Sequence, residues 1–303
     1  MSAKSLSIIF AMFVLCFHEC FGWKGKNQCS CGKTFTQKQL NRVQGGSFAS
    51  ENEFPWQVYV QRYHPYNDDY RYCGGALISR RHVLTAGHCV KNLAGVGFHS
   101  ENLILVKLGS NDRKSREGKL MAVSKIIPHP DYDSSTSTGP DFAILTLTRS
   151  VRLSKSINTV CFPTHSREHY LGKTVSVSGW GKTSVNGSGT RLLKTVNAKV
   201  IGPERCQSFY KSGIHQTYQT CIEKYNNEGV CKGDSGGAYT VEENGRRTAI
   251  GVVSKVSLDD CSNVEKMAAL TDSLISWISQ NTKGVRNSKC EDIEWNFVKI
   301  KVY

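Results

Sequence analysis

Short runs of β-branched and aromatic residues, separated by turn residues, constrain the fold of this chain most strongly. They recur along most of its 303 residues, which is a length compatible with one large all-β unit or two fused halves. Runs of this length and spacing are typical of antiparallel strands in a sandwich or a barrel, so the sequence predicts an all-β protein. The runs are "QVYV", "HVLTA", "LILVKLG", "MAVSKII", "FAILTL", "TVSVSGW" and "RTAIGVV".

Two segments have helical rather than strand character. "GPERCQSFY" carries Pro203 at a suitable first helical position. "TDSLISWISQ" opens with residues that cap helices and places Leu274, Trp277 and Ile278 on one face. We therefore expect one short helix in the second half of the chain and one amphipathic helix near its C-terminal end.

The N-terminal segment has the pattern of a secretory signal. Lys4 is followed by the apolar run "LSIIFAMFVLCF", which is too short to cross a bilayer. We expect cleavage after Gly22, so that residues 1–22 are a signal peptide and the product is extracellular, with no membrane partner. The alternative is that this run forms a buried N-terminal strand or helix.

An export signal changes how the cysteines are interpreted. Two of the twelve lie in the predicted signal peptide, and the even number that remains favours disulfide bonds in an oxidising compartment. No CxxC pair and no Cys/His cluster at zinc spacing is present, so we predict no metal site. The remaining cysteines are Cys29, Cys31, Cys73, Cys89, Cys161, Cys206, Cys221, Cys231, Cys261 and Cys290.

The formal net charge of +14 raises the question of an acidic partner. No nucleic-acid-binding motif accompanies the charge, and the Lys and Arg residues are scattered, so we expect no nucleic-acid partner. A solvated basic surface is the simplest interpretation, and binding to anionic glycans or acidic proteins is the alternative.

Three segments carry residues suited to nucleophilic catalysis. A serine hydroxyl is a weak nucleophile until a neighbouring base takes its proton, and that base must be oriented by a third group. Ser235 lies in "GDSGG", His88 in "LTAGHC", and Asp141 opens the apolar run "DFAILTL". Taken singly, these residues are equally compatible with a turn serine, a surface histidine and a strand-capping aspartate.

Taken together and in this order, "TAGHC", "DFAIL" and "GDSGG" resemble the chymotrypsin/trypsin family of serine endopeptidases over about residues 43–281. The resemblance implies two antiparallel six-stranded Greek-key barrels with a C-terminal helix, and no cofactor. It also implies that Ser235 attacks the scissile carbonyl, that His88 takes its proton and passes it to the leaving amine, and that Asp141 orients the imidazole.

The small residues of "GDSGG" have a role under this resemblance. The tetrahedral intermediate carries an oxyanion, and the backbone N–H groups of Gly233 and Ser235 are expected to bind it. A side chain at Gly233 could obstruct that geometry. Ser254, in "GVVSKV", matches the family serine that supports the buried aspartate.

The resemblance also predicts a zymogen. Asp234 needs a cationic partner if it is buried, and in this family the partner is an amine freed by cleavage of a pro-segment. The matching junction lies between Arg42 and Val43, so residues 23–42 would be the pro-segment and a trypsin-like protease the activator. Gln44 departs mildly from the usual family junction. The alternative is that Arg42 is an ordinary loop residue.

The family also implies a disulfide pattern. Cys31–Cys161 would keep the pro-segment attached to the catalytic domain after cleavage. Cys29 and Cys290 are left over, and they either pair with each other or form intermolecular bonds. The bonds that the resemblance implies are Cys73–Cys89, Cys206–Cys221, Cys231–Cys261 and Cys31–Cys161.

The expected specificity pocket departs from the tryptic pattern. Its floor falls on Gly229 rather than on the aspartate that selects Lys or Arg, and the wall serine Ser254 is followed by Lys255 and Val256 instead of an aromatic residue and glycine. Lys266 replaces a glycine of the lining. Lys266 could pair with an acidic substrate side chain, could fill the pocket together with Val256, or could extend to solvent so that a small apolar side chain binds.

Three further features lie at the margins of the predicted domain. "HPYNDDYRY" and the stretch between His88 and Asp141 are longer than is usual in the family, and such loops flank the cleft and narrow specificity. Asn186 opens a glycosylation sequon in a predicted exposed loop. Residues 282–303 form a basic and aromatic tail.

The sequence thus favours a secreted serine endopeptidase made as a zymogen, with protein or peptide substrates, an activating protease and a protease inhibitor as partners. Its pocket suggests limited proteolysis in an extracellular cascade or in a reproductive or defence fluid. Two alternatives remain. One is a catalytically idle homologue that binds a partner through its basic surface, and the other is a digestive protease with broad cleavage.

Overall fold

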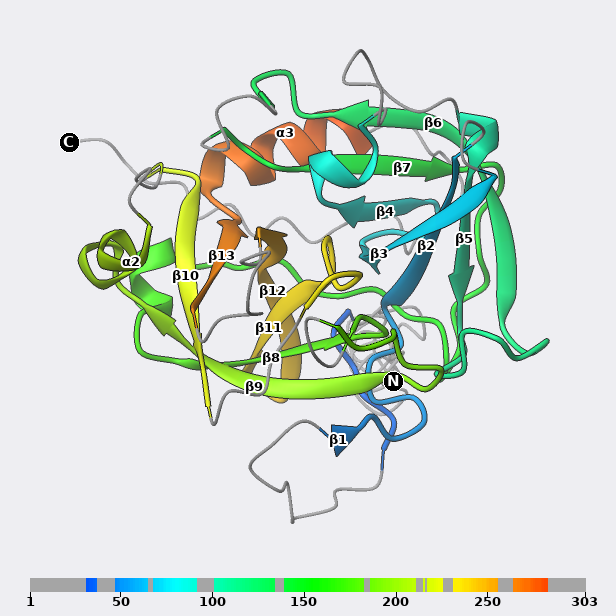
Figure 1. Ribbon diagram of the computed structural model, residues 1–303, viewed down its shortest axis with the longest axis horizontal. Helices are drawn as coiled ribbons and strands as arrows, with labels where there is room; N and C mark the ends of the chain where they lie inside the picture. The colour runs from blue at the N-terminus through cyan, green and yellow to red at the C-terminus, as the bar shows by residue number, and fades with distance from the viewer. Residues whose placement is uncertain are drawn as a thin grey trace, which may run out of the picture.

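In the computed structural model, the first half of the chain forms a closed antiparallel barrel in which each strand is paired on both sides (Figure 1). The strand order is β2-β3-β4-β7-β6-β5. The strands are β2 (Gln57–His64), β3 (Asp69–Leu77), β4 (His82–Thr85), β5 (Ile104–Leu108), β6 (Lys119–Pro128) and β7 (Ala143–Leu147).

The second half forms a second six-stranded barrel. Its strands run in the order β9-β10-β13-β12-β11-β8, and pairing between β8 and β9 closes the sheet. The short strand β1 (Ser47–Phe48) adds to the outside of β9. The barrel strands are β8 (Thr174–Gly179), β9 (Lys194–Ile201), β10 (Gln219–Lys224), β11 (Ala238–Glu243), β12 (Arg246–Lys255) and β13 (Val264–Ala269). The predicted fold class is confirmed.

The helices among the described residues are few and short. Both predicted segments are helical, as α2 (Pro203–Phe209) and α3 (Asp272–Thr282), and single turns of 3-10 helix occur at η1 (Gly87–Cys89), η2 (Glu101–Leu103) and η3 (Arg167–Tyr170). No helix among the described residues has both the length and the apolar character needed to cross a membrane. The structure describes residues 31–36, 47–64, 68–91, 101–133, 139–182, 186–210, 215, 217–225, 231–255 and 264–282.

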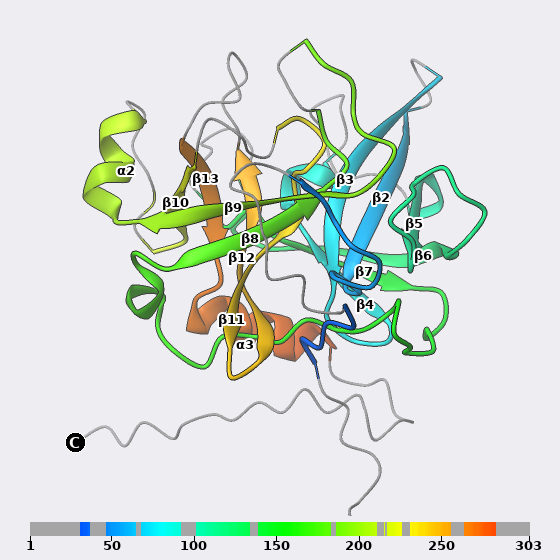
Figure 2. The same ribbon diagram turned by 90° about the horizontal axis from the view of Figure 1, so that it is seen from below.

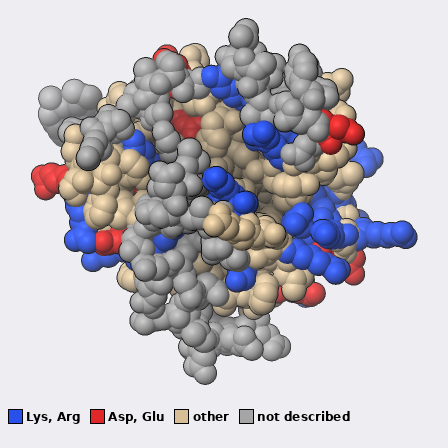
Figure 3. All heavy atoms as spheres, viewed as in Figure 1, with Lys and Arg blue, Asp and Glu red and all other residues tan. Residues whose placement is uncertain are grey.

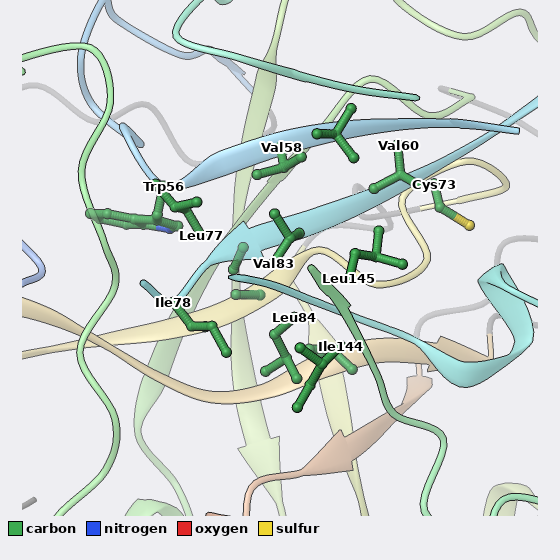
Figure 4. Packing of buried hydrophobic residues seen from close by; sticks show 14 of the residues in the cluster. Trp56, Val58, Val60, Cys73, Leu77, Ile78, Val83, Leu84, Ile144 and Leu145 are labelled. Carbon is green, nitrogen blue, oxygen red and sulfur yellow. The ribbon is translucent and has the colours of Figure 1, made fainter. Parts of the chain in front are cut away.

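Each barrel has its own apolar interior. Figure 4 shows the first, where alternate residues of β2, such as Val58 and Val60, point toward Leu77, Val83 and others from facing strands. A second cluster, which includes Val177, Tyr239 and Met267, fills the other barrel. Period-two alternation places these side chains inside, because successive strand residues point to opposite faces.

The C-terminal helix ties the two halves together. Leu274 and Ile278 of α3 are buried in the same apolar cluster as the first-barrel residues, although α3 follows the last strand of the second barrel. Figures 1 and 2 show α3 beside the first barrel, where the ring of Trp277 lies 4.8 Å from that of His129. The predicted apolar face of this helix is therefore the face that packs against the first barrel.

Every predicted run falls on a strand, but six strands, namely β1, β3, β9, β10, β11 and β13, have no counterpart among the runs. β3 illustrates why, because its polar start and its two glycines hide the strand pattern. Gly74 is required where the barrels meet, since a Cβ there would lie 2.9 Å from the backbone nitrogen of Gly237. The backbone N–H of Gly74 instead donates a 2.7 Å hydrogen bond to the carbonyl of Ser235.

Candidate active site

His88 and Asp141 meet at the end of the first barrel. His88 lies in η1, directly after β4, and Asp141 lies just before β7, which pairs with β4. The Nδ1 atom of His88 is 2.8 Å from Oδ2 of Asp141, and the backbone N–H of His88 donates to Oδ1 at 2.8 Å. The carboxylate thus holds both the ring and the backbone of the histidine, and it favours the tautomer with the proton on Nδ1.

Ser254, at the end of β12 in the second barrel, contributes a third hydrogen bond to the same carboxylate. Its hydroxyl donates to Oδ2 of Asp141 at 2.6 Å. Burial by itself would raise the pKa of Asp141, but the charge and hydrogen bonds of His88, together with the bond from Ser254, lower the pKa below its usual value. Asp141 is therefore held ionised in a buried position, where it can stabilise an imidazolium.

Ser235 lies in the tight loop between Cys231 and β11. Gly233 and Gly236 have φ values of 103° and 84°, which only glycine adopts without strain. A Cβ on Gly236 would also come within 2.2 Å of the Thr85 hydroxyl. The loop thus packs with its backbone directly against β4 of the first barrel, and this contact brings Ser235 to the histidine side of the cleft.

These residues share one cleft between the barrels, of about 1050 Å³, which is lined among others by His88, Asp141, Gly233, Ser235 and Ser254. The Sγ atom of Cys89 lies 3.8 Å from Nε2 of His88 and 3.5 Å from the carbonyl oxygen of Ser235. A serine, an imidazole and a buried carboxylate are thus brought together from both halves of the chain. A serine hydroxyl, an imidazole and a carboxylate are the groups that nucleophilic catalysis uses as nucleophile, base and orienting group.

Asp234 is buried beneath this loop, and no cation among the described residues contacts it. Its Oδ1 accepts a 2.7 Å hydrogen bond from the backbone N–H of Gly181, and its Oδ2 accepts one of 3.0 Å from Cys231. Burial raises the pKa of Asp234 to about 6, against the lowering effect of these two bonds and of the more distant Lys224. Within the described part of the chain, this carboxylate forms no ion pair.

Three disulfide bonds lie wholly within the described residues, and Cys231 is also disulfide-bonded. The Cys73–Cys89 bond joins β3 to the histidine turn, and Cys206–Cys221 joins α2 to β10. Cys31–Cys161 links two segments separated by 130 residues. The expected partner Cys261, like Cys29 and Cys290, lies outside the described residues.

Several predicted specificity and activation residues also lie outside the described part, namely Arg42, Val43, Gly229, Val256 and the side chain of Lys255. Lys266 is described, and it does not extend to solvent. It is buried in β13, with its Nζ 4.4 Å from the centre of the Tyr210 ring. It is not among the residues that line the cleft. The structure therefore gives no support to the expectation that Lys266 pairs with a substrate in this cleft.

One buried cluster of charged and polar side chains was not predicted from the sequence. Lys224 of β10 forms an ion pair with Glu265 of β13, and both side chains are almost completely buried. The hydroxyl of Tyr239 donates to the other oxygen of Glu265 at 2.7 Å. Burial raises the pKa of Glu265 to about 7, although Lys224 and Tyr239 act to lower it. Only the register of the two strands brings these residues together, so no local pattern could have predicted the pair.

Two clusters among the described residues bring three metal-ligating atoms close together. The first, formed by Cys73, His88 and Cys89, uses sulfurs that are already bonded to each other. The second, formed by His165, His169 and Glu243, lies on the second barrel. There Nε2 of His169 lies 2.6 Å from the ammonium of Lys173, so one ring nitrogen of this cluster already has a polar contact.

Known proteins are similar in sequence to this chain over most of the described fold. The family model described as trypsin matches residues 43–278. The chain is 32% identical over 231 residues to melanization protease 1 of Drosophila melanogaster, covering 71% of this chain and 56% of that protein. It is 31% identical over 230 residues to the suppressor of tumorigenicity 14 protein homolog of Bos taurus, covering 74% of this chain and 26% of that protein.

A third relative is matched over most of its own length. The chymotrypsin-like elastase family member 1 of Bos taurus is 30% identical over 244 residues, which cover 78% of this chain and 88% of that protein. The chain thus spans about half and about a quarter of the length of the first two relatives.

Proposed function

The chain belongs to the trypsin family of serine endopeptidases, and from this premise we propose that it is a secreted zymogen that hydrolyses peptide bonds through an acyl-enzyme on Ser235. The family implies protein substrates. The observation that carries the proposal is the pair of hydrogen bonds that Asp141 accepts from His88, in the same cleft as Ser235 and Gly233.

In this mechanism His88 takes the proton of Ser235 as the hydroxyl attacks the scissile carbonyl, and Asp141 stabilises the imidazolium that results. The backbone N–H groups of Gly233 and Ser235 bind the oxyanion of the tetrahedral intermediate. His88 then gives its proton to the leaving amine. A water molecule next attacks the acyl carbonyl while His88 takes its proton, and His88 returns that proton to Ser235 as the acyl group leaves.

Activation proceeds through Asp234. The carboxylate is buried without a cation in the described part of the unprocessed chain, and its raised pKa reflects that cost. Cleavage after Arg42 frees the amine of Val43, which pairs with Asp234 and completes the loop around Ser235. The segment boundaries follow from this: signal peptide 1–22, pro-segment 23–42, protease domain 43–281 and basic tail 282–303. Disulfide bonds among the described residues support export to an oxidising compartment.

For the residue before the scissile bond, the proposal favours a small side chain over Lys or Arg. The predicted floor residue Gly229 carries no charge, and the buried Lys266 is directed toward Tyr210. An acidic side chain at this position remains the competing preference. A cleavage profile of the processed protein on a peptide library separates the two.

The direct test is hydrolysis by the purified protein before and after cutting with a trypsin-like protease that is then removed. We expect activity only in protein whose new N-terminus is Val43, as determined by N-terminal sequencing. Arg42→Gln should block the gain, and Ser235→Ala should abolish activity without changing the cut. Turnover that does not depend on Ser235, or a cut protein that turns over no peptide in the library, would reject the proposal and favour a binding role.

A further inference from the structure

Arg62 is a buried arginine with hardly any partner. It lies in β2, two residues after Val60 on the inward-facing side of the strand, and only 8% of its surface is exposed. Within the described part of the chain, its one hydrogen bond runs from Nη1 to the carbonyl oxygen of His88, at the long distance of 3.5 Å. Its Nε–H is buried and has no hydrogen-bond partner among the residues that the structure describes. Most of its five N–H donors are therefore unused.

A second cation lies on the neighbouring strand. Arg71 of β3 lies directly opposite Arg62 in the register, so the two guanidinium groups repel each other. Burial, and secondly the charge of Arg71, lower the pKa of Arg62 to about 10, so it stays charged at neutral pH. Among the described residues, no carboxylate forms an ion pair with either arginine. A buried cation without a counter-charge is costly.

Both arginines line the cleft that holds His88 and Ser235. They come from β2 and β3 of the first barrel, and Nη1 of Arg62 lies 3.5 Å from the carbonyl oxygen of His88. The Cys73–Cys89 bond joins β3 to the same histidine turn, and the Cys89 sulfur lies 3.8 Å from Nε2 of His88 and 3.5 Å from the carbonyl oxygen of Ser235. The proton carried by His88 goes to the leaving amine, so the chain after the scissile bond must lie on this side of the serine. Ser254, on β12, belongs to the opposite wall.

We propose that Arg62 and Arg71 form a subsite for the carboxylate of an Asp or Glu side chain among the first residues after the scissile bond. A carboxylate would accept two hydrogen bonds from the fork of Arg62 and relieve the repulsion between the two arginines. This inference rests on the proposed function, and it adds a substrate class to it.

The wider surface suits the same ligand. Lys91 and Lys232 also line the cleft, and Figure 3 shows blue Lys and Arg side chains above, to the right of and below the hollow in the middle of the face, with one red acidic patch at its upper left. Arg113 is held elsewhere, because its guanidinium lies over the rings of Tyr59 and Tyr72 and its Nε donates to the carbonyl of Thr190. Arg62 and Arg71 are thus the arginines of this cleft that are left to bind an anion.

The test measures kcat/KM of the processed protein on paired peptides that differ only by Asp against Asn at each of the first three positions after the cut. We expect a preference for Asp of about 10- to 100-fold at one position, which is the usual effect of one charge-assisted hydrogen-bonded pair. Arg62→Gln should bring the Asp/Asn ratio close to one, and Arg71→Gln should lower it severalfold. Because the ratio is taken within each variant, damage to the catalytic centre cancels. Arg152→Gln, an exposed residue away from the cleft, should leave the ratio unchanged.

A wild-type ratio near one, or a ratio that survives Arg62→Gln, overturns the subsite while leaving the protease proposal intact. If the wild type hydrolyses no peptide, the proposed function fails, and calorimetric binding of the same peptides to processed Ser235→Ala protein decides the subsite alone. Equal affinity for the Asp and Asn peptides there overturns it. Arg62-dependent binding of a heparin fragment, with no preference among peptides, would assign the arginines to a glycan and also overturn the proposal.

Discussion

At the residue scale, the catalytic assignment depends on how firmly one carboxylate is held. Asp141 accepts hydrogen bonds from the ring and backbone of His88 and from Ser254, and these contacts come from both barrels. His88 itself is more open, with 35% of its side chain exposed to the cleft. This combination of a fixed carboxylate and an accessible imidazole is what a general base needs, since the base must be oriented and still reach its substrate.

Ser254→Ala tests the role of the supporting hydroxyl. Loss of the 2.6 Å hydrogen bond to Asp141 should raise the pKa of the carboxylate and lower kcat about 10-fold or more, as expected for a hydrogen bond to a charged group. Ser178→Ala is a matched control, because that buried hydroxyl donates to Gln57 and does not contact Asp141. It should leave kcat within about twofold. An unchanged kcat in Ser254→Ala would remove Ser254 from the site.

The two buried acids predict an unusual pH dependence of stability in the unprocessed protein. The pKa of Asp234 is raised to about 6 and that of Glu265 to about 7. Because each native pKa lies above the unfolded one, the native state binds more protons in this range. The free energy of unfolding should therefore fall as pH rises from about 4 to 7, by on the order of 3 kcal/mol for Asp234.

Urea denaturation between pH 4 and pH 7.5 measures this dependence. Asp234→Asn should flatten the fall below about pH 6, and Glu265→Gln should flatten it up to about pH 7. Variants with the same slope as the wild type would show that neither carboxylate is protonated by burial. The contribution of Asp141 to the pH dependence has the opposite sign. Its lowered pKa stabilises the native state, and this stability is lost as the pH falls through the lowered value.

At the element scale, periodicity predicted the parts of the fold that carry their own pattern. The apolar runs all fall on strands, and the two helical segments are α2 and α3. Strands with polar starts or glycines, such as β3, have a weak local signal, because they are specified by what they pack against. Gly74 stands in β3 because the Ser235 loop approaches its backbone.

The candidate site divides in the same way. His88, Asp141 and Ser235 could be predicted because each lies in a distinctive local motif. Arg62 and the Lys224–Glu265 pair could not be predicted, because the contacts of these side chains depend on which strand lies opposite and in what register. Period-two alternation after Val58 and Val60 could have indicated that Arg62 points inward. Nothing in the sequence indicated that Lys266 would lie over Tyr210.

The Cys31–Cys161 bond predicts the fate of the pro-segment. Because Cys31 lies before the predicted cut and Cys161 after it, cleavage at Arg42 should leave the pro-segment covalently attached. Electrophoresis should show one band without reductant and two with it. The double variant Cys29→Ser/Cys31→Ser, which also removes any tether through Cys29, should release the pro-segment under both conditions. Release from the cut wild-type protein without reductant would contradict the bond.

At the scale of the whole molecule, the cleft depends on how the two barrels meet. His88 and Asp141 come from the end of the first barrel, Ser235 and Ser254 from the second, and α3 returns from the second barrel to pack on the first. Any change in how the barrels meet would separate the serine from its base. Asp234 lies beneath this junction without a cation in the described part of the chain, which is why we connect catalysis to a cut far away in the sequence.

Labelling by a fluorophosphonate active-site probe tests both the proposed activation and the catalytic role of Ser235, with the modified residue located by mass spectrometry. We predict nearly stoichiometric modification of Ser235 after cleavage at Arg42, little in the uncut protein, and none in cut His88→Ala protein. Equal labelling of cut and uncut protein would contradict the proposed activation. Absence of label at Ser235 after a verified cut would contradict the catalytic assignment itself.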